Sequence, residues 1–174
     1  WVFLGDGEGG FACRGPYARC TEPYAYDRYT WLELADVNGD GRLDVLAAWP
    51  WEQSWVVVFL NQTTTPGALA FSAGQVFGLE TERGQTSGHQ AYCDPRSEAT
   101  VAAGDLNGDG RPDLVCTPNA TRGIAVRLNT TPSGSATVSF SAPVNFPAHD
   151  GPWRPLLVDV NQDGRLDIVV CNYY

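Results

Sequence analysis

The sequence predicts an all-β protein made of β-propeller-type blades of about four antiparallel strands, with three blades in 174 residues. Two observations support this fold class. First, 19 Gly and 12 Pro accompany short apolar runs, which is typical of short strands joined by many turns. Second, one nine-residue acidic pattern occurs three times, each time between two apolar runs. Such repetition indicates one supersecondary unit used three times.

The acidic pattern reads D-x-N-x-D-G-R-x-D and occupies residues 36–44, 105–113 and 159–167. The apolar runs on both sides predict a strand, an acidic loop and a second strand in each repeat. Further apolar runs at 55–61 and 124–129 predict a third strand. Residues 69–72 and 138–141 are candidates for the fourth. Four short strands per repeat are the content of a propeller blade.

The spacing of the repeats sets the expected blade boundaries. The loops begin at Asp36, Asp105 and Asp159, so successive loops start 69 and then 54 residues apart. We expect a single repeat region over residues 1–174 with blades at 29–77, 98–146, and 154–174 plus 1–11. The missing half of the last blade would come from the chain's own start, from a following tandem copy or from a head-to-tail neighbour. A trimmed piece of a larger protein is a further alternative. Because closed propellers usually have four to eight blades, we favour a larger ring or array.

The loops carry the ligand chemistry of a hard cation. Calcium takes six to eight oxygen ligands, and positions 1, 3, 5 and 9 supply side-chain oxygens. We expect the Arg at position 7 to offer its carbonyl and point its side chain outward, and the Gly at position 6 to allow a sharp turn. About three calcium ions are predicted. The expected ligands are Asp36, Asn38, Asp40, Arg42 and Asp44; Asp105, Asn107, Asp109, Arg111 and Asp113; and Asp159, Asn161, Asp163, Arg165 and Asp167.

An EF-hand or a magnesium site fits these loops less well. An EF-hand needs flanking helices and a Glu at position 12, where this chain has Ala47, Cys116 and Val170. Magnesium prefers fewer protein ligands and more water. Acidic turns that hold no ion are the remaining alternative.

The arrangement resembles the FG-GAP/VCBS repeat family, whose calcium-loop blades occur in the β-propellers of integrin α-subunits and many secreted proteins. The resemblance rests on the three acidic loops and on the Gly-rich segment Leu4 to Phe11. It implies that the loop residues bind calcium. The chain departs from the family where sequon-bearing turns after Leu60 and Leu128 replace the Gly-rich hairpin. Family resemblance alone does not fix a function.

Cysteines and sequons favour an oxidising, secretory origin. We expect Cys13 and Cys20 to form a local disulfide, with Cys93–Cys116 as a second candidate pair and Cys171 unpaired or bonded outside the chain. The first ten residues do not resemble a signal peptide, so a secreted protein would be represented by its mature part. Asn61, Asn119 and Asn129 begin N-glycosylation sequons, which predicts a glycoprotein. Free thiols and accidental sequons are the alternative.

Aromatic residues are expected on the face opposite the acidic loops. Exposed aromatic rings beside polar groups suit sugar rings or a protein partner. Packing of these rings between blades or against a neighbouring copy is the alternative. The candidate ligand-face residues are Trp49, Trp51, Trp55, Tyr92 and Trp153.

The net charge and the absence of catalytic motifs limit the classes of partner and activity that we expect. The net charge is −9 and Lys is absent, so neither nucleic acid nor an anionic membrane is an expected partner. The sequence has no stretch of 18 uninterrupted apolar residues, so we expect no membrane insertion. No nucleophile elbow, phosphate loop or zinc pattern is found, and we expect no enzymatic activity. The sequence predicts a calcium-stabilised extracellular or cell-surface glycoprotein module with a structural or adhesive role, assembling head to tail with copies of itself. The alternative is a lectin that binds glycans with its aromatic face.

Overall fold

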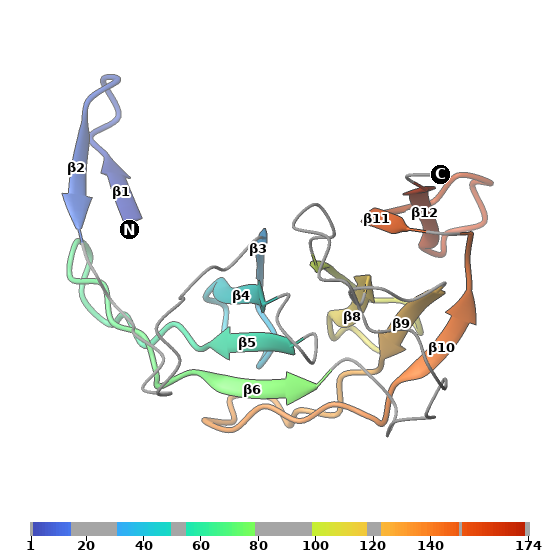
Figure 1. Ribbon diagram of the computed structural model, residues 1–174. Helices are drawn as coiled ribbons and strands as arrows, with labels where there is room; N and C mark the ends of the chain where they lie inside the picture. Colours follow the sequence, from blue (N-terminus) through green and yellow to red (C-terminus); the bar gives the residue numbers. More distant parts are fainter. Residues whose placement is uncertain are drawn as a thin grey trace, which may run out of the picture.

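The computed structural model describes residues 2–14, 31–49, 55–78, 99–117, 123–149 and 151–172 (Figure 1). These residues form 12 strands in four antiparallel sheets of two to four strands, and none of the sheets is closed. The all-β prediction is confirmed for this part of the chain. No helix in it is long and apolar enough to cross a membrane.

Two four-stranded sheets follow one another in the chain. In each, strands that are neighbours in sequence are neighbours in the sheet, as predicted for the repeats. The first acidic loop joins β3 to β4 and the second joins β7 to β8, where Ala35 pairs with Asp44 and Gly104 with Asp113. The first sheet contains β3 (Trp31–Ala35), β4 (Asp44–Trp49), β5 (Trp55–Phe59) and β6 (Gln75–Gly78). The second contains β7 (Thr100–Gly104), β8 (Asp113–Thr117), β9 (Gly123–Arg127) and β10 (Val144–Pro147).

The predicted fourth strands are displaced along the sequence. Residues 69–72 and 138–141 contribute only the isolated bridges Asn61↔Phe71 and Asn129↔Phe140, and the ladder is made by β6 and β10 instead. The apolar alternation at 69–72 marks packing, because Phe71 lies against the buried Phe59 cluster. An edge strand such as β6 can pair through its backbone without an apolar pattern, which is why the sequence pattern missed it.

Two further sheets have two strands each. The β1–β2 hairpin comprises β1 (Val2–Gly5) and β2 (Phe11–Arg14). The β11–β12 sheet comprises β11 (Pro152–Val158) and β12 (Asp167–Asn172), which flank the third acidic loop. The hairpin lies beyond the first sheet, on the side away from β11–β12 (Figure 1).

The core lies between successive sheets. We call the face of a sheet that points toward the next sheet in sequence its forward face, and the opposite one its rear face. The forward face of the first sheet, with Leu46 and Val56, packs on the rear face of the second, with Leu114 and Cys116. The forward face of the second sheet packs on β11–β12 in the same way. The first strands β3, β7 and β11 therefore lie in contact in that order.

One glycine shows how closely the last two sheets approach. A Cβ built on Gly104 would lie 2.8 Å from Leu157 Cδ1 and 2.9 Å from Leu166 Cδ1. A Cβ at this position would therefore require the ends of the Leu157 and Leu166 side chains to move.

Candidate metal centre

The three acidic loops occupy the same place in three sheets. Each joins the first strand of its sheet to the second, so the loops lie at corresponding ends of successive sheets. In each loop, position 6 is a Gly with a positive φ, 84° at Gly41, 81° at Gly110 and 83° at Gly164. This confirms the sharp turn predicted at position 6, because an L side chain would be strained there.

The first Asp of each loop organises the turn. Asp36 Oδ1 accepts a hydrogen bond from Asp40 N at 3.0 Å and Asp36 Oδ2 accepts one from Gly41 N at 2.8 Å. Asp105 and Asp159 accept the corresponding bonds in their loops. The same local geometry is therefore built three times.

The ninth residue joins the loop to the segment that directly follows the third strand of the sheet. Asp44 is fully buried, and its Oδ2 accepts from Val37 N at 2.9 Å while its Oδ1 accepts from Asn61 N at 2.8 Å. Asp113 repeats this with Leu106 N at 2.9 Å and Asn129 N at 2.8 Å.

The third loop lacks one half of this arrangement. Asp167 Oδ2 accepts from Val160 N at 3.0 Å, but no backbone N–H of the described residues reaches its Oδ1. In the other two sheets this donor is Asn61 N or Asn129 N, which lies just after the third strand.

The Arg at position 7 of the first two loops contacts its own loop. Arg42 Nη2 lies 2.6 Å from Asp40 Oδ2, and Arg42 Nε donates to Asn61 O at 2.8 Å. Arg111 makes the same pair of contacts with Asp109 and Asn129 O. The Arg42 and Arg111 side chains thus stay 40% and 44% exposed, as expected for side chains that point outward, but they also contact their own loops. The guanidinium finds two oxygen acceptors on the loop and the third strand, and charge-assisted hydrogen bonds of this kind are strong.

The Asn at position 3 of the first loop carries an oxygen without a partner. Asn38 is buried, and its Nδ2 donates to Asp40 Oδ2 and Ser135 O, both at 3.0 Å. Its Oδ1 is buried and accepts no hydrogen bond. A buried acceptor without a partner costs about 1–3 kcal/mol, and a cation bound to it would remove that cost.

The donor set suits a hard cation. Each ionised carboxylate has about four lone-pair positions, so a loop Asp that accepts one or two N–H groups still has capacity for a metal. In the described part of the chain, however, no three His, Cys, Asp or Glu side chains are gathered into a metal-binding group. The carboxylates are turned instead toward the loop's own N–H groups and Arg. The chemistry of the residues and the free Asn38 oxygen thus fit calcium, with Asp, Asn and carbonyl oxygens as its ligands.

Electrostatics in the first loop also favour a cation. Burial raises the pKa of Asp44 above its ordinary value, the negative charges of Asp40 and Asp36 raise it further, and the N–H groups of Asn61 and Val37 oppose the rise. A bound divalent ion would reverse the repulsion among these carboxylates.

A turn of the second sheet covers the first loop. Gly134 N donates to Asn38 O at 2.6 Å, Ser133 Oγ donates to Gly39 O at 3.2 Å, and Asn129 Nδ2 donates to Val37 O at 2.9 Å. Neighbouring sheets therefore cooperate in holding one loop. The equivalent Asn107 in the second loop is exposed.

The sequon residue Asn129 has a structural role that sequence analysis missed. It is buried, and its Nδ2 donates to Val37 O and to Pro112 O at 3.0 Å. Because both amide hydrogens are used inside the protein, the predicted glycan at Asn129 does not fit this fold. Asn61 is only partly buried and stays a predicted glycosylation site, and Asn119 lies outside the described residues. The Asn-x-Thr pattern here forms a turn in which Thr131 N donates to Asn129 Oδ1 at 2.9 Å.

The cysteine predictions have mixed outcomes. Cys13 is exposed on β2, whereas its predicted partner Cys20 lies outside the described residues, so that pair stays a prediction. Cys116 is a free, buried thiol, and burial raises its pKa to about 12. Its alternative partner Cys93 lies outside the described residues, so the Cys93–Cys116 pair also stays a prediction. Cys171 is exposed and free.

The structure describes three of the five predicted ligand-face residues. Trp49 and Trp55 are paired residues at the ends of β4 and β5 away from the acidic loop, and Trp153 lies on β11. Trp51 and Tyr92 lie outside the described residues. Sequence analysis missed two neighbours of Trp153 at this end of the sheets.

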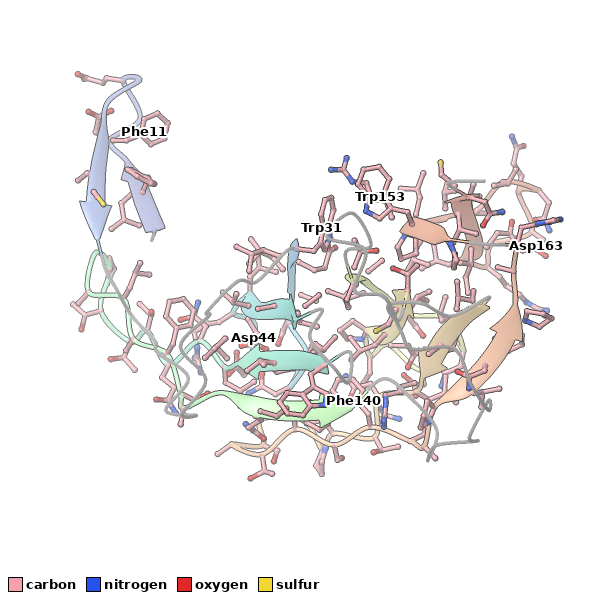
Figure 2. The ribbon with its side chains drawn as sticks, viewed as in Figure 1. Phe11, Trp31, Asp44, Phe140, Trp153 and Asp163 are labelled. Atoms are coloured by element: carbon pink, nitrogen blue, oxygen red, sulfur yellow. The ribbon has the colours of Figure 1, made fainter. Side chains whose placement is uncertain are left out.

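Those neighbours are Arg154 and Trp31. The Arg154 guanidinium carbon lies 4.3 Å from the Trp153 ring centre and 4.8 Å from that of Trp31 (Figure 2). Arg154 has a φ of 50°, and its N donates to Thr100 Oγ1 at 3.1 Å. The Trp153 Nε1 is buried and has no hydrogen-bond partner. No local sequence signal predicts this cluster, because its members come from two different sheets.

Comparison with known families identifies one segment of the chain. Residues 105–170 match the FG-GAP-like repeat. The chain carries an FG-GAP-like repeat. The matched segment runs from the second acidic loop through the third to β12, so it begins within one sheet and ends in the next. The family resemblance of the acidic loops is confirmed there.

A second family model, the EF hand, matches residues 29–46. The match covers the first acidic loop, but the described flanks of that loop are strands β3 and β4 and not helices. Together the two matches indicate a calcium-binding β module. Searches of curated proteins and of solved structures found no match.

Proposed function

We propose that the chain is a calcium-stabilised module of a secreted or cell-surface glycoprotein, that its role is structural or adhesive and not enzymatic, and that it assembles head to tail with copies of itself into a ring or filament. The observation that carries this proposal is the same hydrogen-bonded acidic loop at corresponding ends of three successive sheets. Each loop would hold one calcium ion through its oxygen donors, giving about three ions per chain.

The packing of the sheets supports a propeller-like arrangement. Successive sheets pack face to face, and their first strands β3, β7 and β11 adjoin in order. This is the relation expected between neighbouring blades around one axis. Calcium at the loops would fix the joint between the first two strands of each blade.

An extracellular site of action agrees with the loop chemistry. Exposed loops with few preorganised ligands suit the 10⁻⁴–10⁻³ M affinities of extracellular calcium modules. The second and third loops are largely exposed, and the accessible sequon at Asn61 fits the same compartment.

Calcium titration tests the proposal directly. Calorimetry should find about three ions per chain, and thermal unfolding should shift upward in calcium and downward after chelation. An ion present at 100 times its dissociation constant stabilises the folded state by about 2.7 kcal/mol per site. Asp159→Ala should remove one ion, whereas Glu8→Gln, which changes an exposed acid outside the loops, should remove none. No calcium-dependent heat and no thermal shift would reject the proposal.

One observation favours a second candidate, a lectin. The exposed Arg154 guanidinium lies over the Trp153 and Trp31 rings. Aromatic rings beside an exposed donor suit the apolar faces and hydroxyls of a sugar. Glycan-array binding by the soluble chain that is lost in Trp153→Ala, but kept in a Phe3→Ala control, would support this candidate. The absence of any bound glycan would reject it.

A further inference from the structure

One segment of the second sheet lies along the first sheet, from the first acidic loop to β6. This covering segment, residues 129–140, belongs to the connection from β9 to β10. Figure 1 shows it as the orange trace beneath β6. The segment and the loop at 36–44 belong to the two four-stranded sheets in the middle of the chain, so their contact joins these two sheets.

One half of the covering segment is held on β6 by contacts that do not involve the loop. Gln75 Oε1 accepts a hydrogen bond from Val138 N at 2.8 Å, and Gln75 Nε2 donates one to Ala136 O at 3.3 Å. Phe140 meets Phe77 edge to face, with ring centres 5.1 Å apart. The Val138 side chain is buried in the core between the two sheets. This half of the segment is thus fixed independently of the loop.

The other half of the covering segment binds three successive carbonyls of the first loop. Val37 O, Asn38 O and Gly39 O accept hydrogen bonds from it at 2.9, 2.6 and 3.2 Å. These carbonyls belong to loop positions 2, 3 and 4, so the second sheet helps to set the course of the loop backbone there. The donors are Asn129 Nδ2, Gly134 N and Ser133 Oγ.

A fourth contact fixes the side chain at loop position 3. Asn38 is 5% exposed, and its Nδ2 donates to Asp40 Oδ2 and to Ser135 O, both at 3.0 Å. The amide group is planar, so two acceptors on its nitrogen also fix the direction of its oxygen. That oxygen, Oδ1, is buried and accepts no hydrogen bond from the described residues. It is also one of the ligands predicted for the ion.

Ser135 O is the acceptor that remains for the Asn38 amide when the oxygens of Asp40 and Asn38 serve as ligands. An amide whose oxygen faces a cation has its NH₂ group on the opposite side. This nitrogen then needs an acceptor outside the ligand set, and Ser135 O already occupies that place. Because a buried donor without a partner is costly, this acceptor contributes to the free energy of ion binding.

We propose that Ser135 O positions the Asn38 oxygen for calcium, so that ion binding at the loop 36–44 and hydrogen bonding of the covering segment to that loop stabilise each other. The inference rests on the proposed calcium binding and adds its regulation, since the ion strengthens the joint between the first two sheets. The coupling is reciprocal: the bound segment raises calcium affinity by the same factor by which calcium favours the bound segment. In the alternative state, the segment leaves the loop but stays on β6.

Hydrogen exchange measures the effect of calcium on the segment. Calcium should slow the exchange of amides in residues 129–135 by about 5-fold or more, because Gly134 N donates to the loop. The slowing should be absent in Asp36→Ala, which removes the first ion. It should persist in Asp159→Ala, which removes the third ion instead. The same response in both variants would contradict the coupling.

Two glycines in matching turns allow the reverse effect to be measured. Gly134 and Gly67 have positive φ values of 71° and 81°, and a Cβ on either would meet nothing within 4 Å. Substitution therefore adds backbone strain without a clash. Among the described residues, only the Gly134 turn donates hydrogen bonds to an acidic loop. The turns are closed by the bonds from Ser135 N to Pro132 O and from Ala68 N to Thr65 O.

Gly134→Val should weaken calcium binding at one site about 10-fold by calorimetry, whereas Gly67→Val should leave the affinities unchanged. Both Val variants carry the same strain, so a purely structural effect would lower both thermal midpoints without separating the affinities. Gly134→Asn is the rescue variant. Asn adopts a positive φ more readily than a β-branched residue, so it should restore most of the affinity. Circular dichroism should show all three variants folded.

Two results would overturn the coupling. One is equal calcium affinities in Gly134→Val and Gly67→Val, and the other is exchange in residues 129–135 that does not respond to calcium. Calorimetry on the same samples separates this inference from the proposed function. Calcium bound at about three sites together with either result rejects the coupling alone, whereas an unchanged chain that binds no calcium rejects both.

Discussion

Replacing Asn129 by Ala gives the sharpest test of how the acidic loops are held. The side chain donates to Val37 O and Pro112 O and accepts from Thr131 N, all within 3.0 Å and in a buried place. Loss of three buried hydrogen bonds at about 1 kcal/mol each predicts that Asn129→Ala lowers the free energy of unfolding by about 3 kcal/mol.

Asn61 supplies a matched comparison. It occupies the same position in the first sheet, but its Nδ2 makes a single contact, to exposed Leu43 O at 3.0 Å, and its Oδ1 accepts from Thr63 N. By the same count, the two hydrogen bonds of Asn61 predict that Asn61→Ala costs about 2 kcal/mol. The difference between the two variants isolates the second, buried contact of Asn129 and the link that it makes to the first loop.

The assay is urea unfolding in saturating calcium, followed by Trp fluorescence. The midpoint should fall more for Asn129→Ala than for Asn61→Ala, with similar slopes for both. Peptide masses from a glycosylating host should show Asn129 unmodified. Equal destabilisation by the two substitutions, or a glycan on Asn129 in the folded protein, would refute the role that we assign to it.

We make three further predictions, on the stability of the chain and on the reactivity of a buried thiol. Burial raises the pKa of Glu33 above its ordinary 4.5, so ionisation of this side chain destabilises the folded state. Glu33→Gln should therefore raise the free energy of unfolding at neutral pH. The gain should disappear as the pH falls below about 4.5, where Glu33 is protonated in both the folded and the unfolded state. Because burial raises the pKa of Cys116 to about 12, a thiol reagent should modify it only after unfolding, as mass spectrometry of the labelled peptide would show. Gln162 has a φ of 62° at the position where the other loops have Gly39 and Gly108. Measured by thermal unfolding, Gln162→Gly should stabilise the chain by about 0.5–1 kcal/mol and Gly108→Gln should destabilise it by a similar amount. Changes of the opposite sign would contradict the strain argument.

Local patterns predicted the loops and most of their flanking strands. The Gly at position 6 determines a local turn, and the apolar runs around each loop determine short strands. Both depend on a few neighbouring residues, so the sequence alone predicts them. The fourth strands were missed because β6 and β10 pair through their backbones at a sheet edge, where side-chain periodicity carries little information. The contact of Arg42 with Asn61 O was also missed, since the two residues are 19 apart in the sequence.

The sequence by itself determined that three oxygen-rich turns recur between short strands, because the residue types and their spacing define that chemistry without reference to the rest of the chain. Only the tertiary structure decided which Asn is buried, which loop has a neighbouring turn over it and which apolar faces lack a partner. Those properties depend on contacts between residues as far apart as Val37 and Asn129. Burial is set by what packs on a side chain from elsewhere in the chain, and a local sequence pattern does not contain that information.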